Sequence, residues 1–356
     1  MNFFRSFVAT IVLGSISVIS LNYMVDPLRF FGPESIAKFE KQTRYRFPGL
    51  IRNQQYDSIF VGTSMSHNFI MADIDRLFDT KSLLLPMSGA SLFEQSLMVK
   101  MALATSRPKT VFWEIYDGVL AGRSGEARKG ADFPFYMYDK NIFNDIFYVF
   151  NFTNTLSSIS AIKNNLEGKK VNHNAWRSKE YRAHKYAHGC PYMVVEQMRG
   201  GGILNRNEDL PNNPSDIMTN IDKNLLSIIK ENPEVEFILF APPVSSLYQA
   251  LLLQKQPNIA AALHMAKSYA YPQLLRFKNV RLYDFYTDKV LTHDLSHYRD
   301  FMHYSGELSH RLLEAMKNGR NRVMGNWYQT VFDHKVVMTA YPAEQHIQLC
   351  SQQSSR

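Results

Sequence analysis

Cysteine is scarce in this sequence, and charged residues form no long runs. The 356 residues include 2 cysteines, Cys190 and Cys350, which lie too far apart for a C-x-x-C redox pair or a zinc-ligand spacing. They either pair with each other in an oxidising compartment or remain as separate thiols. Lysine and arginine are scattered, without an arginine-rich arm, a zinc-finger spacing or an RNP-like motif, which argues against nucleic acid as a partner.

Nucleotide and cofactor motifs are also missing, so we expect no cofactor. Some side chains that bind metals do gather near the C-terminal end, namely His293, Asp294, His297, Asp300 and His303. Their spacing matches no helical zinc motif, so we expect no bound metal. The formal net charge of +8 favours an anionic partner, such as a membrane surface or an acidic polysaccharide.

The longest apolar stretch lies at the N-terminus. Residues 7–25 run for about 19 residues without a charge, which is enough for a helix to cross a bilayer core of roughly 30 Å. The residues before Asp26 make a poor cleavage site, so we favour an uncleaved signal anchor over a cleaved signal peptide. Arg5 precedes the stretch. The positive-inside rule then predicts a single-pass protein with the rest of the chain outside the cytoplasm.

Short apolar runs and amphipathic stretches alternate through most of the remaining chain. We predict strands at residues 56–62, 81–86, 109–116, 235–241 and 279–285. Helices are predicted at residues 71–78, 92–104, 215–231, 258–275 and 305–317, the last with Ser305 as its N-cap. The alternation predicts a three-layer α/β/α sandwich with a mostly parallel sheet.

These patterns also suggest how the chain is divided. We expect a transmembrane anchor at residues 1–25, a juxtamembrane connector at 26–55 and the α/β domain at 56–323. A long insertion at residues 118–214 contains an aromatic run and is predicted to form a helical subdomain with its own small core, compatible with a cap over an active site. Residues 324–356 form a tail of unknown structure.

A serine follows the first predicted strand, in the sequence Gly62-Thr63-Ser64. This position lies at the carboxyl edge of a parallel sheet, where ligands bind in open α/β folds. A serine hydroxyl is a poor nucleophile unless a base removes its proton, so a histidine must meet it in space. A serine at the start of a helix is more often an N-cap, and this motif alone does not establish catalysis.

The sequence contains D-x-x-H twice near its C-terminal end, as Asp294/His297 and Asp300/His303. An aspartate and a histidine at this spacing can hydrogen-bond across a turn, which fixes the histidine tautomer and stabilises the imidazolium that forms during attack. Asp300/His303 directly precedes the last predicted helix, whereas the first pair lies in a looser segment. We therefore favour Asp300/His303 as the pair that serves the serine.

Together these motifs resemble the SGNH (GDSL) hydrolase superfamily, and within it the membrane-anchored bacterial DltD-like and alginate-acetylation proteins. The shared features are G-T-S after the first strand, a glycine after the second strand and D-x-x-H before the last helix. The resemblance implies Ser64 as nucleophile, His303 as base and Asp300 as its orienting carboxylate. It also implies an oxyanion hole built from the backbone N–H groups of Ser64 and Gly89.

One feature of that superfamily is absent here. Its third block carries an asparagine that completes the oxyanion hole, whereas residues 113–118 of this chain read WEIYDG. An ionised Asp117 would repel an oxyanion. Either another donor substitutes, namely Asn68 or the Tyr116 hydroxyl, or the site is weaker than that of a typical esterase. His67 is expected at the surface or at the rim of the pocket.

The resemblance implies serine-dependent acyl transfer on a cell-envelope glycan, by an O-acetyltransferase or an acetylesterase. Implied partners are the membrane, a glycan acceptor and a multi-spanning acyl-donor protein. The alternative is a catalytically weak or inactive scaffold or glycan-binding subunit on the same fold, for which the missing asparagine is the best support.

Overall fold

The computed structural model describes residues 2–32, 43–128, 130–168 and 213–325, and in the C-terminal tail residues 327, 328, 335, 338, 341–343 and 345. Cys190 and Cys350 lie outside these ranges, as does the part of the insertion at residues 169–212. The chain divides into two compact units. Unit 1 comprises Met1–Gln55, Met101–Arg107 and Lys129–Ala175, and unit 2 comprises Tyr56–Lys100, Pro108–Arg128 and Trp176–Arg356.

Unit 2 is built on a five-stranded sheet in the order β2-β1-β3-β4-β5, in which every neighbouring pair is parallel. The strands are β1 (Ser58–Gly62), β2 (Ser82–Pro86), β3 (Thr110–Glu114), β4 (Glu236–Ala241) and β5 (Val280–Asp284). They are almost fully buried, as expected for short apolar runs covered by helices on both faces. The predicted parallel α/β fold is confirmed.

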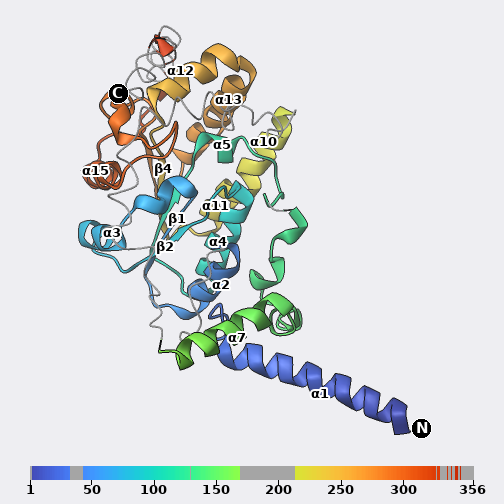
Figure 1. Cartoon of the computed structure of the whole chain (residues 1–356). Helices are drawn as coiled ribbons and strands as arrows, with labels where there is room; N and C mark the ends of the chain where they lie inside the picture. The colour runs from blue at the N-terminus through green and yellow to red at the C-terminus, as the bar shows by residue number, and fades with distance from the viewer. Residues whose placement is uncertain are drawn as a thin grey trace, which may run out of the picture. The chain divides into compact units, whose positions relative to one another are not determined.

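Helices connect these strands and cover the sheet (Figure 1). They are α3 (Met71–Phe78), α4 (Leu92–Thr105), α5 (Asp117–Leu120), α10 (Pro214–Ile221), α11 (Ser227–Glu231), α12 (Ser246–Lys255), α13 (Pro257–Leu274), α14 (Lys289–Thr292) and α15 (Gly306–Lys317), with short helical turns at Ser64–Asn68 (η1) and Leu295–His297 (η8). In the sheet, β2 lies on one side of β1, whereas β3, β4 and β5 follow in order on the other side. Right-handed crossovers therefore place α3 on one face of the sheet and α4, α11 and α13 on the other. The last helix, α15, packs beside α3.

The helices in the structure differ from the predicted helices in two places. The stretch predicted as one helix at 215–231 consists of α10 and α11 joined by a π-helical turn at Asp222–Leu226. Helix α12 was not predicted, because its residues from Ser246 to Leu252 are all buried and show no amphipathic pattern. The predicted N-cap is confirmed, since the Ser305 hydroxyl accepts a hydrogen bond from the Leu308 N–H.

Unit 1 contains α1 (Asn2–Val25), α2 (Thr43–Asn53), α6 (Ile146–Val149) and α7 (Phe152–Leu166), with short turns at Gly130–Asp132 and Phe135–Met137. Within the described ranges, Phe3–Val25 is the one helical segment long and apolar enough to cross a membrane, with a mean hydropathy of 1.8. An N-terminal helix of this kind is a membrane anchor or a signal sequence. The described part of the insertion is helical.

Candidate active site

Ser64 lies two residues after the end of β1, as the first residue of η1. The N-cap of this turn is Thr63, whose hydroxyl accepts a hydrogen bond from the Met65 N–H at 3.3 Å. The capping role is thus filled by the preceding residue, and the Ser64 hydroxyl points elsewhere. Gly62 is required at the strand end because a Cβ there would lie 2.2 Å from the Ser66 Oγ atom.

The Ser64 hydroxyl meets a histidine that is 239 residues away in the sequence. The distance from Ser64 Oγ to His303 Nε2 is 2.7 Å, and His303 Nδ1 lies 2.9 Å and 2.8 Å from the two carboxylate oxygens of Asp300. The three side chains therefore form one hydrogen-bonded chain from carboxylate to hydroxyl. A proton on Nδ1, facing the carboxylate, leaves Nε2 as an acceptor for the serine proton.

The Asp300 carboxylate is buried, and it accepts hydrogen bonds from both the side chain and the backbone of His303. Burial alone would raise its pKa, and the hydrogen bonds from the His303 side chain and from the backbone N–H groups of Met302 and His303 outweigh that effect, so the pKa is lowered. Asp300 therefore stays ionised at neutral pH. It holds the imidazole in one orientation and can stabilise its protonated form.

Gly89 follows β2 and lies beside the same pocket as Ser64. The register places Gly62 opposite Pro86, and the Met87 N–H donates to the Gly62 carbonyl at 2.9 Å, so the loops after β1 and β2 start at the same level. Gly89 has a φ of +62°, a left-handed conformation that favours glycine. A Cβ at this position would also approach the Arg128 guanidinium at 3.1 Å.

The pocket around Ser64 has a volume of about 450 Å³. Its polar lining includes Ser64, Ser88, Arg123, Arg128 and His303, and its apolar lining comes largely from the α12–α13 region. Tyr116 and Tyr248 also line it, with their hydroxyl oxygens 3.3 Å apart. This volume is within the range of pockets that bind small molecules.

Glu114, at the end of β3, lies beneath the serine loop and is fully buried. Its carboxylate accepts hydrogen bonds from the Thr63 N–H at 3.2 Å, from the Thr63 hydroxyl at 2.5 Å and from the Ser66 hydroxyl. Burial raises the pKa of Glu114, and these hydrogen bonds oppose the rise. Sequence reasoning missed this role, because nothing local shows that a strand-end glutamate meets a loop about 50 positions earlier.

Two residues predicted near the pocket instead tie the serine loop to its neighbours. His67 Nε2 lies 3.0 Å from the Ser88 Oγ atom, which links the loop after β1 to the loop after β2. The Asn68 side chain donates to the Tyr304 carbonyl at 2.6 Å. Asn68 is buried and does not line the Ser64 pocket, so of the two alternative donors only Tyr116 lies in that pocket.

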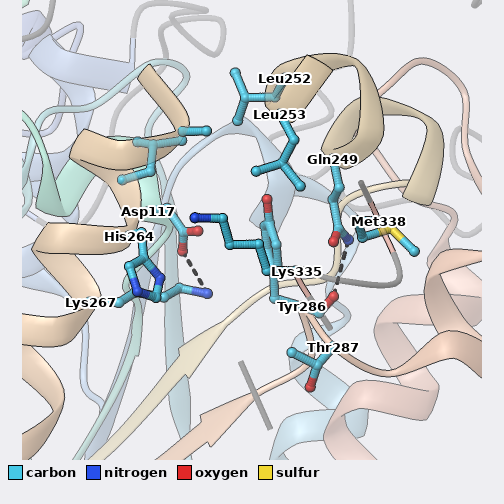
Figure 2. A pocket seen from close by; sticks show the side chains of 12 residues that line it. Asp117, Gln249, Leu252, Leu253, His264, Lys267, Tyr286, Thr287, Lys335 and Met338 are labelled. Atoms are coloured by element: carbon cyan, nitrogen blue, oxygen red, sulfur yellow. Dashed lines mark hydrogen bonds and ion pairs between the residues drawn. The ribbon is translucent and has the colours of Figure 1, made fainter. Parts of the chain in front are cut away.

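Tyr116 and Asp117 are adjacent in sequence but face different cavities. Tyr116 lines the Ser64 pocket, as predicted, and burial raises its pKa well above the usual value, so its hydroxyl keeps the proton that a donor needs. Asp117 lies in a second pocket, lined also by Lys267, Gln249 and Tyr286 (Figure 2). Asp117 therefore does not line the Ser64 pocket.

The reason for that placement is an ion pair. The buried Lys267 ammonium lies 3.0 Å from a carboxylate oxygen of Asp117 and 3.0 Å from one of Asp284 (Figure 2 shows the pair with Asp117). Burial raises the pKa of Asp117 to about 6, against the lowering effect of Lys267. The pKa of Lys267 is raised by the two carboxylates in spite of its burial.

Neither residue of the other D-x-x-H pair, Asp294 and His297, lines the Ser64 pocket. His297 Nε2 lies 3.5 Å from Asp294 and 3.4 Å from the Arg311 guanidinium, and Asp294 caps the turn η8. His293 Nδ1 lies 3.1 Å from the Thr292 hydroxyl. Over the described ranges, no three histidine, cysteine, aspartate or glutamate side chains come together in an arrangement suited to a metal ion.

Comparison with known proteins gives a likeness of fold. No family model matches the chain, and no curated protein matches it in sequence. A solved structure from Streptococcus pneumoniae, provisionally described as a platelet activating factor, is 11% identical with a TM-score of 0.38, and the match covers 78% of this chain and 91% of that chain. A Bacteroides fragilis protein, provisionally described as an acylhydrolase, is also 11% identical, with a TM-score of 0.35 and coverage of 74% and 86%. The functional argument below therefore depends on the site itself.

Proposed function

We propose that this protein is a serine-dependent acyltransferase or esterase that uses Ser64, His303 and Asp300 as a catalytic triad. The observation that carries the proposal is the continuous hydrogen-bonded chain, with 2.7 Å from Ser64 Oγ to His303 Nε2 and 2.8 Å from His303 Nδ1 to Asp300. This is the arrangement that activates a serine hydroxyl in acyl transfer on unrelated folds.

The proposed reaction has two halves. In the first, Ser64 Oγ attacks the carbonyl carbon of an acyl ester while His303 Nε2 takes the hydroxyl proton. The tetrahedral intermediate collapses, the ester bond breaks, and His303 returns the proton to the departing alcohol. In the second, an acceptor hydroxyl or water loses its proton to His303 and attacks the acyl-serine, which restores Ser64. A glycan acceptor gives transfer, and water gives hydrolysis.

The oxyanion would be held by the backbone N–H groups of Ser64 and Gly89, because both residues line the pocket at the carboxyl edge of the sheet. The superfamily asparagine has no counterpart in this chain. We propose the Tyr116 hydroxyl as third donor, because Tyr116 lines the pocket and its raised pKa keeps it protonated. Its partner Tyr248, with the two hydroxyl oxygens 3.3 Å apart, would orient it.

The proposed site of action is the periplasmic face of the bacterial inner membrane, with α1 as an uncleaved anchor and an envelope glycan as acceptor. Two features support this proposal. Helix α1 is long and apolar enough to span a bilayer. Arg123 and Arg128 line the pocket with Glu126, which gives the lining an excess of positive charge suited to an acidic polymer. A multi-spanning membrane protein is proposed as acyl donor.

The proposal is tested by labelling the full-length protein in detergent with a fluorophosphonate probe, which reacts with activated serines. We expect labelling that is lost in Ser64→Ala and reduced at least a hundredfold in rate in His303→Gln. The control is His297→Gln, which removes the histidine of the other D-x-x-H pair and should leave labelling unchanged. Absence of labelling in a folded wild-type protein would overturn the proposal and favour a non-catalytic glycan-binding or scaffold subunit.

A further inference from the structure

Besides α1, one other part of unit 1 has many exposed apolar side chains. They lie on and around α6 and α7, and we call them the α6–α7 surface: Phe143, Phe147, Phe150, Phe152, Leu156 and Ile159. Phe143 is 85% exposed and Phe152 is 77% exposed. Between residues 143 and 162 the only charged residue is Asp145. An apolar surface of this kind usually marks a contact with a protein or a membrane.

Helix α7 has the opposite polarity to a helix of a water-soluble protein. Phe152, Leu156 and Ile159 follow the spacing of one helical face, and that face is exposed. The buried positions include the polar residues Asn154 and Ser158. A helix on a protein in water buries its apolar face and exposes its polar face. The reversed arrangement is stable where the outer medium is itself apolar.

The polar face of α7 is buried against α1. Asn22 of α1 is fully buried, and its amide donates to the Val149 carbonyl at 2.8 Å and to the Thr155 hydroxyl at 2.9 Å. The Ser158 hydroxyl donates to the Asn22 side-chain oxygen at 2.9 Å. Hydrogen bonds between polar side chains of neighbouring helices are typical of packing within membranes.

This contact occupies only the C-terminal end of α1. Leu21, Asn22 and Val25 take part in it, whereas the side chains from residue 3 to residue 14 are exposed. If α1 spans the bilayer, its C-terminal end lies at the outer membrane–water interface, where aromatic residues are enriched. Tyr23 of α1 is 58% exposed at this level. The exposed phenylalanines of the α6–α7 surface lie on and beside the two helices that pack against α1.

We infer that the α6–α7 surface is a second membrane contact, which lies in the outer interface of the bilayer beside the end of α1 and is occupied by lipid. The inference rests on the part of the proposed function that makes α1 an uncleaved anchor. Lipid is favoured over a protein partner because α6 and α7 pack against α1, the helix that would enter the bilayer, and because the exposed face of α7 is apolar while its polar side chains are buried against α1. The anchor would then be held by a helix pair rather than by a single helix.

The test uses the full-length protein with Cys190→Ser and Cys350→Ser, reconstituted in vesicles of phosphatidylcholine and phosphatidylglycerol. Single cysteines carrying a spin label are placed by Leu156→Cys and Ile159→Cys on α7, by Ile11→Cys on α1 and by Val290→Cys on unit 2. Collision with oxygen, which concentrates in lipid, is compared with collision with a water-soluble nickel chelate. Val290 is the matched control, because it is an aliphatic residue that is 75% exposed and lies outside unit 1.

We expect the ratio of oxygen to nickel accessibility at positions 156 and 159 to be several-fold higher than at 290 and to approach that at 11. A ratio at 156 and 159 equal to that at 290 overturns the inference, and so does protection from both reagents, which would indicate a protein partner or a second copy. A lipid-like ratio at position 11 with water-like ratios at positions 156 and 159 would contradict the inference about α7, but it would still support α1 as a membrane anchor. Water-like ratios at all four positions would contradict both the inference and the proposal that α1 is a membrane anchor.

Discussion

The side-chain amide of Asn68 donates a hydrogen bond of 2.6 Å to the backbone carbonyl of Tyr304, and this bond is buried. Asn68 ends the turn that begins with Ser64, and Tyr304 directly follows His303. The bond therefore joins the two segments that carry the proposed nucleophile and base, which are otherwise far apart in sequence. Together with the links from His67 to Ser88 and from Thr63 to Glu114, it fixes the serine turn on three sides.

Asn68→Ala is expected to lower kcat at least tenfold and to leave KM nearly unchanged, because a small misplacement of nucleophile and base costs rate rather than binding. Loss of the amide also leaves the Tyr304 carbonyl buried without this donor, which should reduce the free energy of unfolding by roughly 1–3 kcal/mol. Hydrolysis of an aryl acetate and urea unfolding measure the two effects. A control is Asn165→Ala, at an exposed position in unit 1. Unchanged kcat in Asn68→Ala would show that the bond does not position the triad.

Asp300→Asn is expected to lower kcat by roughly 10³–10⁴-fold, because the amide no longer favours the histidine tautomer that leaves Nε2 free to accept the serine proton. The substitution keeps the size of the side chain, and the backbone N–H donors of Met302 and His303 can still reach its oxygen. Ester hydrolysis and probe labelling report the rate. Asp294→Asn, in the other D-x-x-H pair, should retain full activity. A modest loss that is equal in the two variants would count against the assigned role of Asp300.

Local patterns in the sequence were sufficient to predict the sheet, and they singled out the three side chains that the fold joins by hydrogen bonds, Ser64, His303 and Asp300. Each strand is a short buried run next to turn residues, and the serine and D-x-x-H motifs each lie at an element boundary that can be recognised without a structure. The parallel sheet then brings the ends of these elements to one edge. The N-cap at Ser305 was predictable for the same reason, since capping depends on neighbouring residues only.

What could not be predicted depends on contacts between distant segments. Glu114 looks like any acidic residue at a strand end, and only the fold places it under Thr63 and Ser66. Asp117 follows β3, whose carboxyl end lies at the same edge of the sheet as Ser64, but its ion pair with the buried Lys267 holds it in the neighbouring cavity. The exposed apolar face of α7 is equally invisible in sequence, where an apolar stripe at helical spacing predicts a core-facing surface.

Arg128→Gln is expected to raise KM for an anionic ester substrate severalfold more than for a neutral one, with kcat for the neutral ester nearly unchanged. Arg128 lines the pocket, with its guanidinium 3.5 Å from the carbonyl oxygen of Gly89. Its positive charge would therefore attract a negatively charged group of a bound substrate more than a neutral one. Steady-state kinetics with succinyl and butyryl esters of one alcohol provide the comparison. Arg311→Gln, on α15, is the control, since Arg311 pairs with Glu307. Equal changes in KM for both esters would argue against recognition of an acidic group.

The buried Asp117 carboxyl should make stability depend on pH. Burial raises its pKa from the ordinary 3.8 to about 6, although Lys267 works in the opposite direction. Between these values the folded protein holds a proton that the unfolded chain has released, so the stabilisation is fully present below pH 3.8 and is lost as the pH rises through about 6. The physical reason is that one ionised aspartate suffices to balance the buried Lys267, and a second buried negative charge is costly.

Asp117→Asn removes this titration, and its free energy of unfolding should therefore fall less steeply than that of the wild type between pH 4 and pH 6. The difference between the two slopes, integrated over this interval, is expected to be at most about 3 kcal/mol. Urea unfolding at a series of pH values measures it. Asp216→Asn replaces an exposed aspartate and should give a curve parallel to the wild type. Parallel curves for Asp117→Asn as well would mean that Asp117 titrates normally, and that Lys267 is balanced by two ionised carboxylates.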